Sequence, residues 1–212
     1  MKIPGEVVNR LTLYHFILED LNEGDVYISS KKIAKFLEID DSQVRKDLKY
    51  INTVGKRKLG YNAKELKKAI EEKLGFKKTR DVFIVGAGNL GSALAKYSTF
   101  KDYGMNIIAM FDTDPKKIGT IINGKEVFDI TKVGHMVQKL NVDIAILTVP
   151  KEYAKGAANY LAGSGIKYIW NFTPCILDVP DNIKVWNENL IGSFLQFTNR
   201  DEVEDDKNDD GN

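Results

Sequence analysis

Apolar residues in the first 75 positions recur three or four residues apart, which is the spacing of one face of a helix. This pattern predicts a helix over residues 6–22 and three further short helices, each preceded by a residue type that caps helix N-termini. The caps are Ser29 or Ser30, Asp40 or Asp41, and Asn62. A basic loop bracketed by Gly55 and Gly60 separates the last two helices, and Gly75 ends the fourth.

The pattern changes at Asp81, after which Val82-Phe83-Ile84-Val85 forms a continuous apolar run. Such a run is typical of a strand in a parallel sheet that is covered on both faces. Further strands are predicted at 106–111, 143–149, 167–170 and 183–186, with helices near 89–101, 129–140 and 151–163. Strands that alternate with helices indicate a doubly wound α/β sheet. A last amphipathic helix is predicted over 188–199.

A glycine-rich loop lies between the first of these strands and the helix that follows it. It reads Gly86-Ala87-Gly88-Asn89-Leu90-Gly91. In a dinucleotide fold the first glycine permits a tight turn, the second lets the backbone approach the pyrophosphate, and the third allows close packing of helix on strand. The N-terminus of the helix stabilises the phosphate charge.

Asp112 ends the next strand, 21 residues beyond Gly91. A carboxylate at this point accepts hydrogen bonds from the adenosine ribose hydroxyls and repels a 2′-phosphate, so it favours NAD(H) over NADP(H). We therefore expect NADH or NAD⁺ as the ligand. The alternative is a Rossmann-like domain that binds nothing or binds another nucleotide.

Three further segments lie where strands end, and ligands bind at the carboxyl ends of strands in open α/β sheets. They are Asp112-Thr113-Asp114-Pro115 with the lysines after it, Thr148-Val149-Pro150, and Asn171-Phe172-Thr173-Pro174. Each is either part of the nucleotide site or an ordinary turn.

Charge is distributed unevenly although the net charge is only +1. Residues 31–80 hold 16 Lys and Arg against 7 Asp and Glu, whereas residues 81–212 hold 13 against 18. A basic helix face reads base edges in the major groove of double-stranded DNA, while cations in a neighbouring loop contact phosphate. The alternative is a helical dimerisation or substrate-cap module with a charged exterior. The expected DNA contacts are Gln43, Arg45, Lys46, Lys49, Tyr50, Lys56, Arg57 and Lys58.

Composition argues against several other classes of protein. The chain has no apolar run of transmembrane length and no apolar signal segment at its start, so a cytoplasmic protein without membrane contact is expected. The chain has one cysteine, Cys175, and two histidines, His15 and His135. We therefore expect neither an intramolecular disulfide nor a metal site. Hydride transfer needs an acid–base group beside the substrate carbonyl, and we expect neither histidine to serve as that group. We therefore predict that the chain is not an enzyme. A small NAD-dependent oxidoreductase is the competing hypothesis.

Taken together, these residues resemble the Rex family of redox-sensing transcriptional repressors over about residues 2–199. The resemblance rests on separate motifs along the chain. They are Ile28-Ser29-Ser30, Gln43-Val44-Arg45-Lys46-Asp47-Leu48, Gly55-Lys56-Arg57, Gly60-Tyr61-Asn62, the glycine loop, Phe111-Asp112, Asp114-Pro115, Lys117-Ile118-Gly119, Thr148-Val149-Pro150 and Asn171-Phe172.

The resemblance implies a winged-helix DNA-binding domain over residues 1–78 and a Rossmann NAD(H)-binding domain over 79–187. It implies a homodimer in which the C-terminal helix, residues 188–200, is exchanged between subunits, and an operator that is released when NADH binds. The remaining residues, 201–212, form an acidic tail that we expect to be disordered.

The resemblance also adds site residues. It implies that Ser30 contacts DNA and that Tyr97 lies beside the nicotinamide as a candidate switch residue. The full set of expected cofactor-binding residues is Gly86, Ala87, Gly88, Asn89, Leu90, Gly91, Tyr97, Asp112, Asp114, Lys117, Thr148, Val149, Pro150 and Asn171.

The chain departs from the family at three places. Lys49-Tyr50-Ile51-Asn52 stands where the family usually has Ser-Tyr-Phe-Gly. Phe16 and Asn189 stand where the family has an Arg and an Asp, which form an ion pair between the DNA-binding domain of one subunit and the nucleotide domain of the other. These departures keep open a third hypothesis, a Rex-like DNA-binding protein with a weakened or altered response to NADH.

Overall fold

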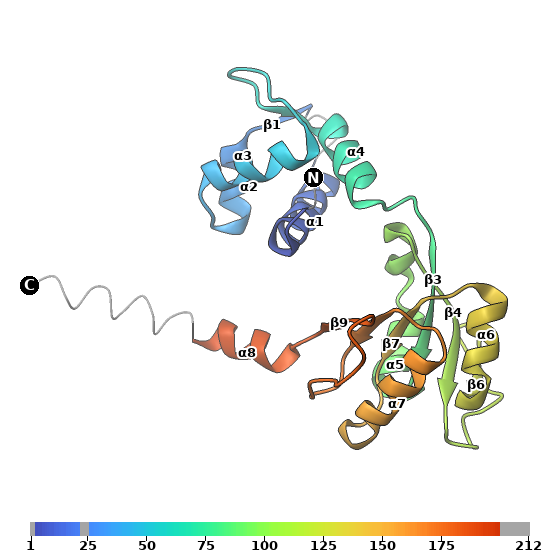
Figure 1. The fold of residues 1–212 in the computed structure, drawn as a ribbon. Helices are drawn as coiled ribbons and strands as arrows, with labels where there is room; N and C mark the ends of the chain where they lie inside the picture. Colours follow the sequence, from blue (N-terminus) through green and yellow to red (C-terminus); the bar gives the residue numbers. More distant parts are fainter. Residues whose placement is uncertain (1–2, 22–25, 200–212) are drawn as a thin grey trace, which may run out of the picture. The chain divides into compact units, whose positions relative to one another are not determined.

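The computed structural model describes residues 3–21 and 26–199, which form two compact units (Figure 1). Unit 1 contains Met1–Lys78 and Asp102–Gly104, and unit 2 contains Thr79–Lys101 and Met105–Asn212. Each unit has a hydrophobic core of its own. The predicted acidic tail, 201–212, and the predicted break after the first helix, 22–25, lie outside the described residues.

Unit 1 consists of short helices and a small two-stranded sheet. Its elements are α1 (Gly5–Glu19), β1 (Tyr27–Ile28), α2 (Ser30–Leu37), α3 (Asp41–Leu48), the 3-10 helix η1 (Lys49–Ile51), β2 (Tyr61–Asn62) and α4 (Ala63–Leu74). The side chains of Ser29, Asp40 and Asn62 accept hydrogen bonds from the first turns of α2, α3 and α4, which confirms the predicted caps. Gly75 ends α4 in the left-handed conformation, as predicted.

The basic loop of unit 1 is a hairpin next to this sheet. Strand β1 pairs antiparallel with β2, and Lys56 and Gly60 form a bridge inside the loop. Gly60 has a φ of +95°, and a Cβ there would collide with the backbone of Ile28. Glycine is therefore required for the hairpin to lie against β1. The core beneath it is formed by Leu11, Tyr14, Ile33, Val44, Leu48, Leu66 and Ile70, among others.

Unit 2 is built on one seven-stranded sheet with the order β5-β6-β4-β3-β7-β8-β9. All neighbouring strands are parallel except the edge pair β5–β6. The strands are β3 (Arg80–Val85), β4 (Met105–Asp112), β5 (Ile121–Ile122), β6 (Lys125–Asp129), β7 (Ile144–Leu147), β8 (Tyr168–Asn171) and β9 (Lys184–Asn187). The helical elements are α5 (Asn89–Lys96), η2 (Ser98–Tyr103), η3 (Ile130–Lys132), α6 (Val133–Leu140), α7 (Lys151–Gly163) and α8 (Leu190–Thr198).

Both faces of this sheet are covered, so the predicted α/β class is confirmed. Phe83 and Val85 face a core that includes buried residues of α6 and α7, whereas Val82 and Ile84 face a core that includes Ala95 of α5. Helices therefore flank the sheet on both sides, as in a doubly wound fold. Within the described residues, no helix is both long and apolar enough to cross a bilayer.

Two regions of unit 2 differ from the sequence-based expectation. The short strands β5 and β6 were not predicted, because the segment around Gly124 alternates too briefly to be distinguished from a turn. The predicted helix over 89–101 was wrong in its second half, since α5 ends at Lys96 and the chain continues as the 3-10 helix η2. The backbone of Tyr97 is extended, which interrupts the helix.

Candidate functional sites

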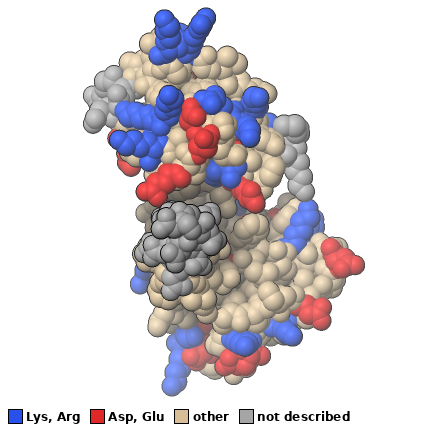
Figure 2. Space-filling view, turned by 90° about the vertical axis from the view of Figure 1, so that its left-hand side faces the viewer, with Lys and Arg blue, Asp and Glu red and all other residues tan. Residues whose placement is uncertain are grey.

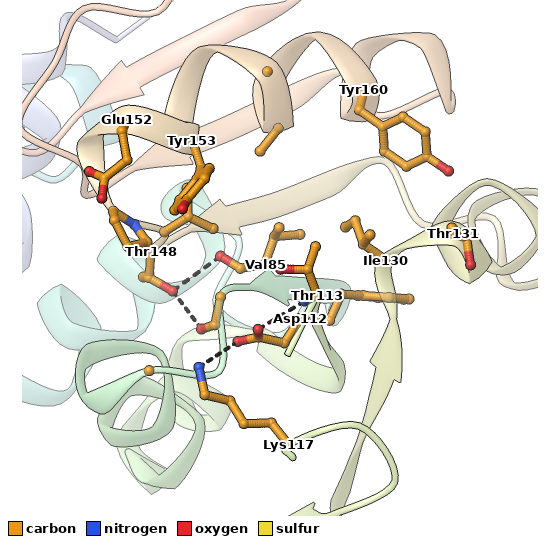
Figure 3. Close-up of a pocket in the computed structure, with 17 residues that line it drawn as sticks. Val85, Asp112, Thr113, Lys117, Ile130, Thr131, Thr148, Glu152, Tyr153 and Tyr160 are labelled. Atoms are coloured by element: carbon orange, nitrogen blue, oxygen red, sulfur yellow. Dashed lines mark hydrogen bonds and ion pairs between the residues drawn. The ribbon is translucent and has the colours of Figure 1, made fainter. Parts of the chain in front are cut away.

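A cavity of about 800 Å³ opens at the carboxyl ends of β3, β4 and β7 in unit 2 (Figure 3). Its volume lies within the range of ordinary ligand sites. Its walls come from the glycine loop, from the turn after β4 and from one side of α7. The lining residues are Val85, Gly86, Gly88, Phe111, Asp112, Thr113, Lys117, Ile130, Thr131, Thr148, Val149, Pro150, Glu152, Tyr153, Gly156, Ala157 and Tyr160.

The three glycines of the loop have different surroundings. Gly86 has a φ of +107°, which other residues rarely adopt. A Cβ at Gly91 would collide with the carbonyl oxygen of Gly86, so close packing of α5 on the loop requires glycine there. A Cβ at Gly88, by contrast, would meet no atom within 4 Å. The loop thus leaves open space at the glycine that lets a phosphate approach the backbone, and the residues present fit a dinucleotide.

Asp112 is held at the end of β4 by four hydrogen bonds. Its Oδ2 accepts from the backbone N–H of Ala87 at 2.8 Å and from Lys117 Nζ at 3.0 Å. Its Oδ1 accepts from the N–H groups of Thr113 and Asp114 at 2.8 and 2.9 Å. Burial would raise the pKa of Asp112, but these donors outweigh burial and hold the pKa below its ordinary value. The carboxylate is therefore charged at neutral pH and fixed beside the glycine loop.

Thr148 connects the end of β7 to the glycine loop. Its hydroxyl lies 2.9 Å from the carbonyl oxygen of Gly86, to which it donates a hydrogen bond, and its N–H donates to Val85. These bonds hold the loop from the neighbouring strand, and Figure 3 draws the two hydrogen bonds of the Thr148 hydroxyl as dashed lines. A residue that the sequence offered only as a strand-end candidate thus acts as a support for the turn at Gly86.

The structure brings about half of the expected cofactor-binding residues into the cavity wall. Those that line it are Gly86, Gly88, Asp112, Lys117, Thr148, Val149 and Pro150. Ala87 and Asp114 act through Asp112, because their N–H groups donate to its carboxylate. Asn89, Leu90 and Gly91 form the first turn of α5. Their contact with a nucleotide stays a prediction.

Tyr97 and Asn171 lie elsewhere in unit 2. Tyr97 follows α5, is 55% exposed, and packs edge to face on Phe100 with ring centroids 4.9 Å apart. Asn171 is buried, and its amide contacts Thr173 and Asn187 at the end of β8. Neither lines the cavity, so their roles in nucleotide binding also stay predictions.

Sequence reasoning missed the wall that α7 provides. Tyr153, Gly156, Ala157 and Tyr160 line the cavity from one side of that helix. Their spacing of three, four and seven residues is that of one helical face, with two small residues between two tyrosines. This spacing was the signal that could have identified them.

A second candidate site is the basic surface of unit 1. Blue Lys and Arg side chains dominate the upper part of Figure 2, which is this unit. Arg45, Lys46 and Lys49 are exposed on α3 and η1, and Lys56, Arg57 and Lys58 are exposed on the hairpin. Arg45 pairs with Asp41 and lies 3.5 Å from the hydroxyl of Ser30. The cations of this helix face and of the hairpin are therefore exposed to solvent.

Two polar residues of α3 have a different role from the exposed cations. Asp47 is fully buried and accepts hydrogen bonds from Arg10, Tyr14 and Gln43. The amide of Gln43, an expected DNA contact, is therefore partly engaged inside the unit, at 2.8 Å from Asp47. Asp47 is a structural residue that the sequence did not identify. Its three-residue separation from the buried Val44 places both on one helix face.

Lys56 is held in place on the hairpin by an aromatic neighbour. Its Nζ lies 2.8 Å from the hydroxyl of Tyr27 and 5.3 Å from the centre of that ring. The hydrogen bond with the Tyr27 hydroxyl raises the pKa of Lys56, so this cation stays charged at neutral pH. The hairpin therefore has one cation of defined position at its base.

Parts of the chain match two described protein families. Residues 77–175 match the family described as CoA binding domain, and residues 2–49 match the one described as Putative DNA-binding protein N-terminus. The first match contains every residue that lines the cavity of unit 2, and the second covers the part of unit 1 from α1 to the start of η1.

Whole-length relatives cover both units. The redox-sensing transcriptional repressor Rex of Clostridium botulinum (strain Hall / ATCC 3502 / NCTC 13319 / Type A) is 42% identical over 197 residues, which are 92% of this chain and 94% of the relative. The protein of the same name from Treponema denticola is 44% identical over 198 residues, with the same coverage. These names agree with the prediction that the chain is not an enzyme.

Solved structures give the same result. The crystal structure of RSP, a Rex-family repressor, is 36% identical with a TM-score of 0.83, and covers 97% of this chain and 96% of its own. RSP in complex with β-NADH has a TM-score of 0.85 at 37% identity, covering 97% of each chain. RSP in complex with β-NAD⁺ and operator DNA has a TM-score of 0.85 at 35% identity over the full length of both. The chain therefore belongs to the Rex family of redox-sensing transcriptional repressors.

Proposed function

We propose that this protein is a repressor that binds operator DNA through unit 1, binds NADH and NAD⁺ through unit 2, and releases the operator when NADH binds. The observation that carries the proposal is the presence in one chain of a basic helix face and of a cavity with Gly88 and Asp112 at its wall. The relatives described above support it, because one of them was solved with β-NADH and with β-NAD⁺ and operator DNA. Such a regulator works in the cytoplasm, where chromosomal DNA and the nucleotide pool meet in a bacterium.

On the DNA side, α3 is the recognition helix and the hairpin is the wing. Arg45 and Lys46 are exposed on α3 and reach base edges or phosphates, while Lys56 and its neighbours contact the backbone of the duplex. Ser30 lies beside Arg45 and adds a hydroxyl for phosphate. Because several cations displace counterions, DNA affinity falls steeply as salt rises.

On the nucleotide side, the chain supplies a phosphate cradle and a ribose acceptor. The backbone at Gly88 approaches the pyrophosphate, and the N-terminus of α5 stabilises its charge. Asp112 accepts from the ribose hydroxyls. When bound, the nucleotide carries the redox information, because its reduced and oxidised forms differ in charge at the nicotinamide ring.

We propose further that the protein is a homodimer that exchanges α8. Five apolar side chains of this nine-residue helix are half or more exposed, and they are Leu190, Ile191, Phe194, Leu195 and Phe197. An apolar surface on one short helix is expected to be covered by another protein surface. A second copy of the chain offers equivalent surfaces, and the resemblance to the family favours that partner.

The oxidoreductase hypothesis has one sequence feature in its favour. Tyr97 and Lys101 have the Tyr-x-x-x-Lys spacing that some dehydrogenases use for proton transfer. The helix ends at Lys96, however, and neither residue lines the cavity. We therefore expect no turnover of NADH with small carbonyl substrates.

The direct test is DNA binding measured by fluorescence anisotropy with a set of Rex-type operator fragments and a scrambled duplex. The proposal expects tight, salt-dependent binding to an operator, retained with NAD⁺ and weakened by NADH. NADPH at the same concentration is the matched control and should have little effect. Absence of binding to any operator, or equal effects of all three nucleotides, would contradict it.

A further inference from the structure

We propose that Lys117 reduces the preference for NADH over NADPH that Asp112 establishes. Its ammonium group competes with the ribose hydroxyls for the Asp112 carboxylate, and it supplies a positive charge for a 2′-phosphate. This inference rests on the proposed nucleotide-binding function. Asp112 alone would predict a simple preference for NAD(H), and no arginine occurs in the turn that follows it. The structure places a lysine there instead, 3.0 Å from the Asp112 carboxylate.

The carboxylate of Asp112 has no acceptor site to spare. An ionised carboxylate offers about four lone-pair positions. All four are used, by the N–H groups of Ala87, Thr113 and Asp114 and by the ammonium group of Lys117. A ribose hydroxyl that donates to Asp112 must therefore replace one of these donors.

Only one of the four donors can leave easily. Three are backbone N–H groups fixed in the glycine loop and in the turn after β4. Lys117 is a flexible side chain, and it is 38% exposed, against 11% for Asp112. The cost of separating a partly exposed ion pair is small, so Lys117 is the donor that a ribose displaces.

The displaced ammonium group stays close to the ribose. Lys117 lines the cavity itself, and Figure 3 shows its side chain reaching to Asp112 from the loop that follows β4. Of the lining residues in the described part of the chain, Lys117 is the one cation. A 2′-phosphate, which Asp112 repels, would find in Lys117 a counter-charge at this end of the cavity.

The two residues therefore act in opposite directions. For NADH, Lys117 is a competitor that the ribose must displace, so removing the ammonium group strengthens binding. For NADPH, Lys117 is the attractive charge that offsets the repulsion from Asp112, so removing it weakens binding. Lys117 thus narrows the preference for NADH that Asp112 establishes.

The test is calorimetric titration of the full-length protein with NADH and with NADPH. Lys117→Met keeps the aliphatic length of the side chain and removes the charge. We expect it to tighten NADH by about two- to fivefold and to weaken NADPH by a similar factor, as for loss of one partly exposed charge pair. Lys116→Met is the matched control, because Lys116 is exposed and does not line the cavity. It should leave both affinities unchanged.

A second variant tests the same pair from the other side. Asp112→Asn removes the repulsive charge and frees the Lys117 ammonium group, so NADPH should bind more tightly than to the wild type. The double variant with Lys117→Met should keep the part of this gain that comes from the lost repulsion and lose the part that comes from the freed ammonium group. Equal changes for both nucleotides in Lys117→Met, or no change, would overturn the inference while leaving the proposed function intact. Failure of the wild type to bind NADH would instead contradict the proposed function. Thermal melting of each variant shows whether it is folded.

Discussion

Arg10 of α1 and Asp47 of α3 form a two-bond ion pair, with Nε–Oδ2 and Nη2–Oδ1 distances of 2.6 and 2.9 Å. The hydroxyl of Tyr14 donates to the same carboxylate at 2.7 Å. Because Asp47 lies two residues from Arg45 on α3, these bonds fix the rotation of the helix that carries the expected DNA contacts. The pair thus connects the core of unit 1 to its basic face.

Asp47→Ala should destabilise unit 1 by about 3 kcal/mol, because it leaves Arg10, Tyr14 and Gln43 without their common acceptor. Urea unfolding measures the change. Asp41→Ala, which removes the partner of the exposed Arg45, is the control and should cost no more than about 1 kcal/mol. Equal effects of the two substitutions would show that the buried network adds no stability.

The same network makes stability depend on pH. Burial would raise the pKa of Asp47, but hydrogen bonds from Arg10, Tyr14 and Gln43 outweigh burial and hold the pKa below its ordinary value. A carboxyl with a lower pKa in the folded state stabilises the fold above its unfolded pKa, about 3.9. That contribution is lost as pH falls through the folded pKa. The free energy of unfolding should therefore fall more steeply below about pH 4 in the wild type than in Asp47→Asn. Parallel curves would contradict this assignment.

Gly88 and Gly91 should respond differently to the same added methyl group. Gly88→Ala places it in open space, so the stability of unit 2 should change little while NADH binding weakens about tenfold or more. Gly91→Ala drives it into the carbonyl of Gly86, so the unit should lose about 1–3 kcal/mol of stability. Melting curves with and without NADH separate the two effects. A Gly88→Ala protein with wild-type affinity would place the pyrophosphate elsewhere.

The wild type should bind NADH more tightly than NADPH, because Asp112 is charged and close to the expected ribose position. Asp112→Ala should weaken NADH and reduce the difference between the two nucleotides, since it removes a hydroxyl acceptor and a repulsive charge together. Calorimetry measures both affinities. If the wild type bound both nucleotides equally, the role given to Asp112 would be wrong.

Arg45→Ala and Lys46→Ala should each weaken operator binding by about 1–3 kcal/mol, because both side chains are exposed on α3, the proposed recognition helix. A substitution that removes a phosphate contact should also reduce the salt dependence of binding. Lys68→Ala is a matched control, because Lys68 is an exposed cation on α4 that pairs with Glu72. If neither α3 variant differs from Lys68→Ala, another surface binds the operator.

The response to NADH should be weaker than in relatives that carry an Arg and an Asp at the positions of Phe16 and Asn189. Phe16 is 43% exposed and packs edge to face on Tyr103, with ring centroids 5.9 Å apart, so it makes an apolar contact instead of an ion pair. A ligand shifts a two-state equilibrium only by its differential affinity for the two states, and loss of an exposed pair changes the starting balance by about 1 kcal/mol.

The double variant Phe16→Arg with Asn189→Asp should increase the ratio of operator affinities measured without and with saturating NADH, by roughly fivefold. Leu13→Arg with Asn189→Asp is the control, because Leu13 is an exposed apolar residue on the same helix and adds the same charge. A wild-type ratio as large as that of a relative with both charged residues, measured side by side, would refute the weaker response.

Several features of the site were predictable because they depend on residues close together in the chain. The caps at Ser29, Asp40 and Asn62 bond to N–H groups two or three residues away. The glycine loop needs only a strand before it and a helix after it, and both patterns are visible in the sequence. The basic character of α3 and of the hairpin is likewise a property of composition within one segment.

Other features depend on contacts between segments that are distant in the chain. The sequence does not reveal that Asp47 is buried, because the residues that donate hydrogen bonds to its carboxylate, Arg10 and Tyr14, lie 37 and 33 residues away in the chain. The wall of α7 faces the glycine loop only because β7 pairs with β3. The Lys117 ammonium group lies against Asp112 because the turn after β4 folds back on itself. The sequence by itself determined which segments carry basic, apolar and glycine-rich chemistry. The tertiary structure decided which of their charges are paired, since pairing depends on distances that no local pattern records.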